Sequence, residues 1–512
     1  MRTKKAILNT FASFILQIVT FIIGLIIPVL IIDTYGSSLN GLRASIAQFI
    51  GYLYIIEMGL GGALTFALYQ PIVENNILKI NSILSAAKKS YYETGVYFSV
   101  LVVSMMIIYP LFVVSDDINR YEVMLLILAL GVPNVINLFT ISKYNVLITA
   151  SQYNYVISFT RIIYLCINTV IILVLVKLNL NISLVYLFST VASLFQMLII
   201  KLYTKSKYKY IDLNVKPDNS AISKRYDVLL HQISAMVVFG SPVILLTLIC
   251  TLEDVSVYSI YSMIFWGINM IVGVFNSGFT AGFGQIIAQK DHIKLKKTYS
   301  QYEFAFYNII TFVYSCVLIL GIPFIEIYTK NITDVNYVDP LILYLFIIIG
   351  ILNNWKLPQS TIINAAGHYK ETRNRAILEA VITLVASTIL VIYFGLIGAL
   401  IGSIIGLVYR SIDLFYIKRI TDIGFKNTFI RILRIFVIGG FAVAPFLIWI
   451  PLNPHNLMEW FLAAIIVSIW VGVVVLVFGF VFERNTMKVT ITKLYRGITS
   501  IIERDKRGNS GN

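Results

Sequence analysis

The sequence predicts an all-α, polytopic membrane protein with about 14 transmembrane helices. Three observations lead to this prediction. Hydrophobic residues make up 58% of the 512 residues and charged residues only 13%, against about 25% charged in soluble proteins. Mean hydropathy is +0.84. The apolar runs are continuous rather than alternating, which favours helices over the strands of a membrane barrel.

The apolar runs are each about 20 residues or longer, which is enough to cross the hydrocarbon layer. The first follows Met1-Arg2-Thr3-Lys4-Lys5 and is too long for a signal-peptide core, so it is predicted to be the first span. Only Phe394-Gly395-Leu396 separates spans 11 and 12. The predicted spans are 7–32, 41–68, 91–114, 121–148, 156–178, 182–203, 226–250, 256–288, 302–328, 339–363, 374–394, 396–418, 429–450 and 458–482.

The distribution of basic residues predicts the orientation. With the N-terminus in the cytoplasm, all but four of the 40 Lys and Arg residues fall on the inner side; the exceptions are Arg43, Arg120, Lys177 and Lys330. Omitting one span would invert every later loop and remove this bias. The positive-inside rule therefore favours an even number of spans in a cell membrane, with both termini cytoplasmic. The net charge of +15 has the same origin and does not indicate nucleic-acid binding.

Features that recur at a fixed offset indicate an internal repeat. A shift of 216 residues places Gly24 on Gly240 and Tyr153 on Tyr369. Because each half then holds six spans, the repeat is parallel, about an axis along the membrane normal. The predicted organisation is an N-terminal lobe (1–215), a C-terminal lobe (216–425), two extra helices (426–483) and a basic cytoplasmic tail (484–512). Two such lobes are expected to enclose a central cavity and to move by rocking.

Catalytic and metal-binding patterns are not found in the sequence. It contains no Walker A, HExxH, GxSxG or dinucleotide-binding motif, four His, and three Cys without CxxC spacing. We therefore expect no cofactor, no metal site and no enzyme activity.

Ionisable residues within the spans are the candidate functional residues, because each costs about 2.5–3.5 kcal/mol at the bilayer centre. The simpler, non-functional explanation for Lys143 and Arg161 is that their side chains snorkel to the inner interface. For Arg410 and Asp413 it is a local ion pair within one helix. Glu57 and Glu379 fit either a structural or a cavity role. The predicted cavity cations are Arg43, Lys143, Arg161, Lys356 and Arg410. The candidate carboxylates for cation coupling are Glu57, Glu379 and Asp413.

Two stretches carry a family resemblance. The first stretch is Tyr35-Gly36-Ser37-Ser38-Leu39-Asn40-Gly41-Leu42, followed by Glu57-Met58-Gly59-Leu60-Gly61. The second stretch is Ala366-Gly367-His368-Tyr369-Lys370-Glu371-Thr372, followed by Glu379-Ala380 and Gly395-Leu396-Ile397-Gly398. Both resemble the bacterial polysaccharide-repeat-unit (Wzx-type) flippases of the multidrug/oligosaccharidyl-lipid/polysaccharide exporter superfamily. Ser241-Pro242 stands where the family often has an Asp, which puts cation coupling at that position in question.

The resemblance implies a two-lobed flippase. It would move an undecaprenyl-diphosphate-linked oligosaccharide, for capsule or O-antigen synthesis, from the inner to the outer leaflet of the bacterial cytoplasmic membrane. The implied partners are the lipid-linked oligosaccharide, membrane lipids, and polysaccharide polymerase and other assembly proteins. Two alternatives stay open: a multidrug/cation antiporter of the same superfamily and, with less support, a membrane-embedded polymerase.

Overall fold

The computed structural model describes residues 2–113, 118–218, 226–421, 423–449 and 452–509, and within these it is all-helical. Thirteen helical stretches of the described residues are long and apolar enough to cross a membrane. One of them, Glu371–Thr421, contains two helices joined at Gly395 (φ 54°, ψ −132°), which is the division predicted between spans 11 and 12. The all-α fold class is therefore confirmed, with thirteen candidate stretches among the described residues where 14 spans were predicted.

The chain forms two compact units, which are described separately. Unit 1 comprises Met1–Ile264, Asn331–Val335 and Thr372–Ser403, and unit 2 comprises Phe265–Lys330, Asn336–Glu371 and Ile404–Asn512. The predicted lobes 1–215 and 216–425 stay a prediction. Residues 219–225 of the second predicted lobe and the last three residues of the predicted tail lie outside the described residues.

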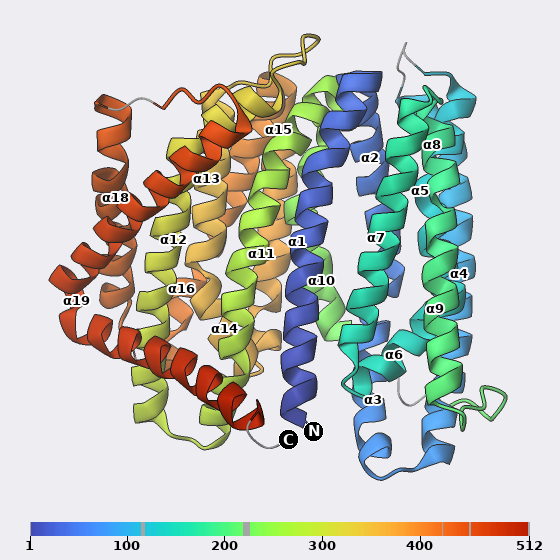
Figure 1. The fold of residues 1–512 in the computed structure, drawn as a ribbon, viewed down its shortest axis with the longest axis horizontal. Helices are drawn as coiled ribbons and strands as arrows, with labels where there is room; N and C mark the ends of the chain where they lie inside the picture. The colour runs from blue at the N-terminus through green and yellow to red at the C-terminus, as the bar shows by residue number, and fades with distance from the viewer. Residues whose placement is uncertain (1, 114–117, 219–225, 422, 450–451, 510–512) are drawn as a thin grey trace. The chain divides into compact units, whose positions relative to one another are not determined.

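Unit 1 holds the first ten α-helices. Their bounds are α1 Arg2–Tyr35, α2 Ser37–Leu53, α3 Leu60–Val73, α4 Ile77–Phe112, α5 Arg120–Ile136, α6 Ser142–Ala150, α7 Asn154–Lys177, α8 Ile182–Ser189, α9 Val191–Lys207 and α10 Tyr226–Ile249. Within it, α5 packs against α4 and α8, and α7 packs against α1 and α9 (Figure 1). The packed faces form one hydrophobic core that includes fully buried Leu42, Leu64 and Leu126.

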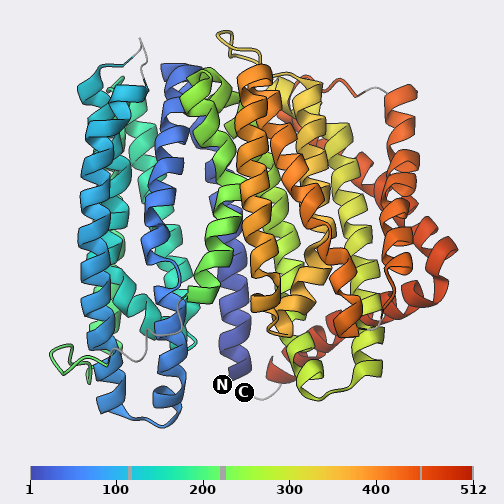
Figure 2. The ribbon, with the colours of Figure 1, turned by 180° about the vertical axis from the view of Figure 1, so that it is seen from behind.

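One end of unit 1 collects the features expected on the cytoplasmic side. Figure 2 shows the α3–α4 turn and the segment after α9 at the same end as the first residues of α1. Asn81 Nδ2 donates to the Tyr210 carbonyl (3.0 Å), and Lys79 pairs with Asp218 (2.5 Å). The ammonium groups of Lys5 and Lys207 lie 3.7 and 3.3 Å from the ring centroid of Tyr153, and Lys5 contributes most to lowering the pKa of its phenol. The loops predicted to share one side of the membrane therefore lie at the same end of this unit.

Two spans of unit 1 are broken within the apolar layer. After α2 the chain forms a 3₁₀ turn, Tyr54–Glu57, and restarts as α3 beyond Gly59, whose left-handed backbone (φ 84°) favours glycine. Between α5 and α6 the segment Asn137–Ile141 is π-helical. Two carbonyls of this segment accept hydrogen bonds from side chains: Lys143 Nζ donates to Phe139 (3.0 Å) and Ser142 Oγ to Asn137 (3.1 Å). Such breaks occur in membranes only where protein or water satisfies the backbone.

Unit 2 is built around α12 (His292–Tyr328). This helix packs against α13 (Pro340–Trp355), α18 (Phe425–Ile448) and α19 (Leu457–Asn509) (Figure 1). The shorter helices are α14 Leu357–Ala365, α16 Asp413–Tyr416 and α17 Lys418–Thr421, while α11 Leu252–Ala288 and α15 Tyr369–Arg410 contribute to both units. The break between α13 and α14 lies at Lys356, 216 residues after Thr140 of the π-helical segment, which is the offset of the predicted repeat.

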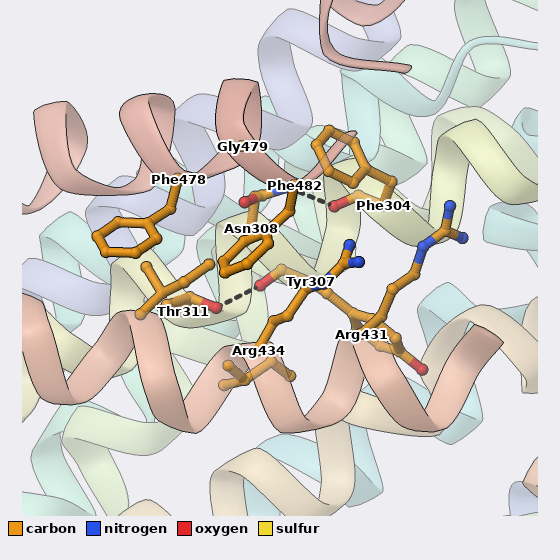
Figure 3. A pocket seen from close by; sticks show the side chains of 11 residues that line it. Phe304, Tyr307, Asn308, Thr311, Arg431, Arg434, Phe478, Gly479 and Phe482 are labelled. Atoms are coloured by element: carbon orange, nitrogen blue, oxygen red, sulfur yellow. Dashed lines mark hydrogen bonds between the residues drawn. The ribbon is translucent and has the colours of Figure 1, made fainter. Parts of the chain in front are cut away.

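A buried ion network joins the two extra helices to α12. Arg431 of α18 donates to Glu303 of α12 (2.8 Å) and to Glu483 of α19 (2.7 Å), and Arg434 donates to Glu483 (2.7 Å). The Glu303 side chain is fully buried and also accepts hydrogen bonds from Tyr299, Gln359 and Thr428. Figure 3 shows Arg431 and Arg434 beside Phe304 and Tyr307 of α12 and Phe482 of α19, around a cavity of about 20 Å³.

We expect Arg431→Ala to destabilise the protein by about 3–5 kcal/mol, because it leaves the buried Glu303 carboxylate without its cation. Thermal unfolding of the purified protein in detergent measures the loss. The double variant Glu303→Met/Arg431→Met should lose less stability than Arg431→Ala, since no unpaired charge stays buried. Lys294→Ala, at an exposed position on α12, is the control. Equal unfolding temperatures for Arg431→Ala and the wild type would contradict a structural role for the network.

Candidate functional site

A polar cavity of about 190 Å³ lies inside unit 1, where the broken span α5–α6 meets α7, α8 and α9. Its polar lining is mostly neutral: three asparagines, a glutamine, two tyrosines and two serines accompany one arginine. These residues are Asn134, Asn137, Arg161, Tyr164, Asn168, Tyr186, Ser189, Ser193 and Gln196. A cavity so lined is expected to hold water, since buried waters take two to four polar partners.

Arg161 is the only charged side chain of this lining. It lies seven residues into α7, about 10 Å along the helix axis from Asn154 at 1.5 Å per residue. Its guanidinium carbon is 4.7 Å from the ring centroid of Tyr164. Among the described residues Arg161 makes no ion pair with a carboxylate. The cavity therefore presents an uncompensated guanidinium, which suits a planar, bidentate contact with a phosphate or carboxylate.

Breaks in the surrounding helices give the cavity its shape. Asn137 begins the π-helical segment and donates from Nδ2 to the Tyr54 hydroxyl (3.4 Å) in the 3₁₀ turn of the second span. On another wall, α8 ends at Ser189 and α9 starts at Val191, and the hydroxyls of Ser189 and Ser193 bond to the Tyr186 and Thr190 carbonyls. Local departures from α-helix thus direct polar groups to one place.

Arg43 and Glu57, two of the predicted site residues, lie on the second span near this cavity. Arg43 Nη2 donates to Asn40 (3.3 Å), and its guanidinium interacts electrostatically with Tyr186 of the lining. Glu57 ends the 3₁₀ turn and accepts a hydrogen bond from the Tyr91 hydroxyl (3.4 Å).

The other predicted residues lie elsewhere. Lys143 is bound to the Phe139 carbonyl of the π-helical segment, and Glu379 is buried in the part of α15 that belongs to unit 1. Lys356 lies at the α13–α14 break of unit 2. Arg410 and Asp413 of the same unit form an ion pair (2.5 Å). The roles predicted for these residues in substrate binding or coupling stay predictions.

The neutral members of the cavity were missed in the sequence analysis. Asn134, Asn137, Asn168 and Gln196 each stand inside an apolar span. An unpaired amide in an apolar environment costs about 2 kcal/mol or more, so four in three consecutive spans are a usable signal. The predicted site residues are all charged, so these amides are not among them.

Comparison with solved structures shows which fold this is. An inward-facing multidrug resistance MATE family transporter of the MOP superfamily has a TM-score of 0.66, with 16% identity over 82% of this chain and 96% of that chain. Lipid II flippase MurJ, in an inward closed conformation, has a TM-score of 0.67, with 15% identity over 94% of this chain and 99% of that chain. A eukaryotic MATE transporter has a TM-score of 0.58, with 15% identity over 85% and 98%.

No family model and no curated protein matches the chain. At these identities the likeness shows the fold alone, a fold shared with the MATE transporter and the MurJ flippase. The protein is thus a multi-pass membrane protein with a transporter fold.

The cavity's hydration can be tested with cysteines in a variant that lacks Cys166, Cys250 and Cys316. Asn168→Cys faces the cavity, and Val170→Cys lies two residues further on α7 at a position 57% exposed on the helix surface. Because the reactive species is the thiolate, which needs water, we expect a small charged thiol reagent to modify Asn168→Cys about tenfold faster or more. Equal rates would mean that the cavity is dry in the membrane.

Proposed function

We propose that this protein is a flippase that moves a lipid-linked oligosaccharide, carried on a diphosphate, between membrane leaflets by alternating access. The observation that carries the proposal is the unpaired Arg161 guanidinium within a polar cavity of the membrane-spanning unit 1. A diphosphate requires such a cation, and sugar hydroxyls match the amide and hydroxyl groups around it. The volume of about 190 Å³ suits a phosphate or one sugar with its waters rather than the whole substrate.

The likeness to the MurJ flippase supports a lipid-linked substrate. The MurJ comparison covers 94% of this chain and the MATE comparison 82%. We place the protein in the bacterial cytoplasmic membrane with both termini inside, which agrees with the basic end of unit 1. There the membrane potential would favour export of an anion by about 2.3 kcal/mol per charge per 100 mV. A polysaccharide polymerase and other assembly proteins are the expected partners.

Replacing Arg161 tests the proposal. We expect Arg161→Ala to slow transport of a fluorescent undecaprenyl-diphosphate oligosaccharide in proteoliposomes by about 10- to 100-fold, because charge-assisted hydrogen bonds contribute about 1.5–3 kcal/mol. Arg161→Lys should retain part of the rate, since the charge remains but the bidentate geometry is lost. Lys177→Ala removes a charge from the last turn of the same helix and should transport normally. Undiminished transport by Arg161→Ala would remove the basis of the proposal.

An antiporter for organic cations is the second candidate, favoured by the MATE-like fold and by Glu57 at a helix break beside the cavity. Cation efflux should then depend on Glu57 and survive Arg161→Ala. The two candidates thus predict opposite responses to the same pair of variants. A polymerase has less support, because the described connections between spans, such as Thr329–Asp339, are short.

Coupling of the flippase to a cation gradient makes a separate prediction. A carboxylate in a polar setting can bind a proton or Na⁺, so Glu57→Gln should transport at a basal rate that no longer responds to a gradient. Initial rates before and after ionophores collapse the proton and sodium gradients measure this response. Glu74→Gln, at an exposed carboxylate beyond α3, should behave as the wild type. If collapsing both gradients leaves wild-type transport unchanged, the coupled version is wrong.

A further inference from the structure

Unit 2 contains a pocket of about 640 Å³, lined by charged, polar and apolar side chains, that the proposed function does not use. It lies where the first turns of α12 meet the start of α18 and the middle of α19. Arg431, a charged side chain only 9% exposed, reaches it from α18. The pocket is therefore built on the ion network that joins these three helices.

The charges around this pocket do not balance. Glu303 and Glu483 are neutralised by Arg431 and Arg434 through contacts of 2.7–2.8 Å. Lys296 and Lys297 also line the pocket, both are exposed, and neither pairs with a carboxylate of the described residues. Two carboxylates thus face four cations, which leaves two positive charges for an anion.

Neutral donors and apolar groups complete the pocket. The exposed amides of Asn427 and Asn485 enter it from α18 and α19. Ile293 and Val489, also part of the lining, are 85% and 38% exposed. A ligand that satisfied all of these groups would carry a compact anion and an apolar portion.

The position of the pocket along α12 identifies the source of such a ligand. Lys296 and Lys297 stand in the first two turns of a helix whose later turns, up to Tyr328, are mostly apolar. Lysines at such a helix end lie at the depth of lipid headgroups, where an anionic leaflet attracts them. An anionic lipid would place its phosphate against the lysines and its acyl chains against Ile293.

We propose that this pocket binds the phosphate of an anionic membrane lipid. Lys296 and Lys297 hold the phosphate oxygens, and Asn427 and Asn485 donate to the remainder of the headgroup. Because the contacts come from α12, α18 and α19, the bound lipid clamps the two extra helices to α12. The site is independent of the Arg161 cavity and of the proposed flippase activity.

Lipid binding to the purified full-length protein in neutral detergent tests the proposal. Native mass spectrometry counts bound phosphatidylglycerol, and thermal unfolding with increasing lipid gives an apparent affinity. With about fivefold in affinity per lysine, we expect Lys296→Gln/Lys297→Gln to bind about 25-fold more weakly. The double variant Lys290→Gln/Lys294→Gln removes the same charge from exposed positions next to the pocket and should stay within about twofold of the wild type.

Other ligands identify the source of the phosphate, and an arginine variant controls for misfolding. Phosphatidylcholine, glycerol phosphate and inorganic phosphate should each stabilise the protein much less than phosphatidylglycerol. Lys296→Arg/Lys297→Arg should restore binding, which a merely misfolded glutamine variant would not explain. Equal losses of lipid affinity in the two double glutamine variants would mean that general surface charge causes the effect. Equal stabilisation by inorganic phosphate and by phosphatidylglycerol would exclude a lipid as the source. Either result overturns the proposal.

Discussion

The structure of unit 1 depends on one electrostatic constraint: a guanidinium that stays charged cannot be left in hydrocarbon. Arg161 stands well inside α7, and no carboxylate of the described residues neutralises it. Its charge must therefore be solvated by polar side chains and water. A π-helical turn, a 3₁₀ turn and the α8–α9 break direct amides and hydroxyls around a cavity that water can fill. The irregular backbone of three spans is thus grouped around one cation.

Unit 2 meets the same constraint in the opposite way. Arg431 is buried, but carboxylates from two other helices neutralise it, and the lone pairs of Glu303 are occupied by further donors. Such a saturated network fixes which helices pack together. The two units thus show the two stable settings for an arginine within a membrane protein: an ion-paired core, and a polar cavity available to a ligand. Only the second leaves its guanidinium without a carboxylate partner among the described residues.

The spans were predictable from the sequence because a run of about 20 apolar residues has few other structures open to it. Even the closely spaced pair around Gly395 was separated correctly.

The breaks within spans were not predicted. Asn137 and Lys143 occur in a stretch that composition alone assigns to a plain helix, and only packing determines where the π-helical turn falls. Arg161 stands out in the sequence because a charge within an apolar span is conspicuous, whereas the neutral residues that line the cavity with it do not. Glu303 and Arg431 are 128 residues apart, and sequence separation gives no sign that they meet.

The central claim is that the Arg161 cavity receives the anionic part of a lipid-linked substrate. The most direct measurement is a structure of the full-length protein determined with an undecaprenyl-diphosphate-linked sugar in a lipid nanodisc. The claim predicts a phosphate oxygen about 2.7–2.9 Å from the guanidinium nitrogens of Arg161. A substrate held with its diphosphate on other residues, while only water occupies the Arg161 cavity, would contradict it.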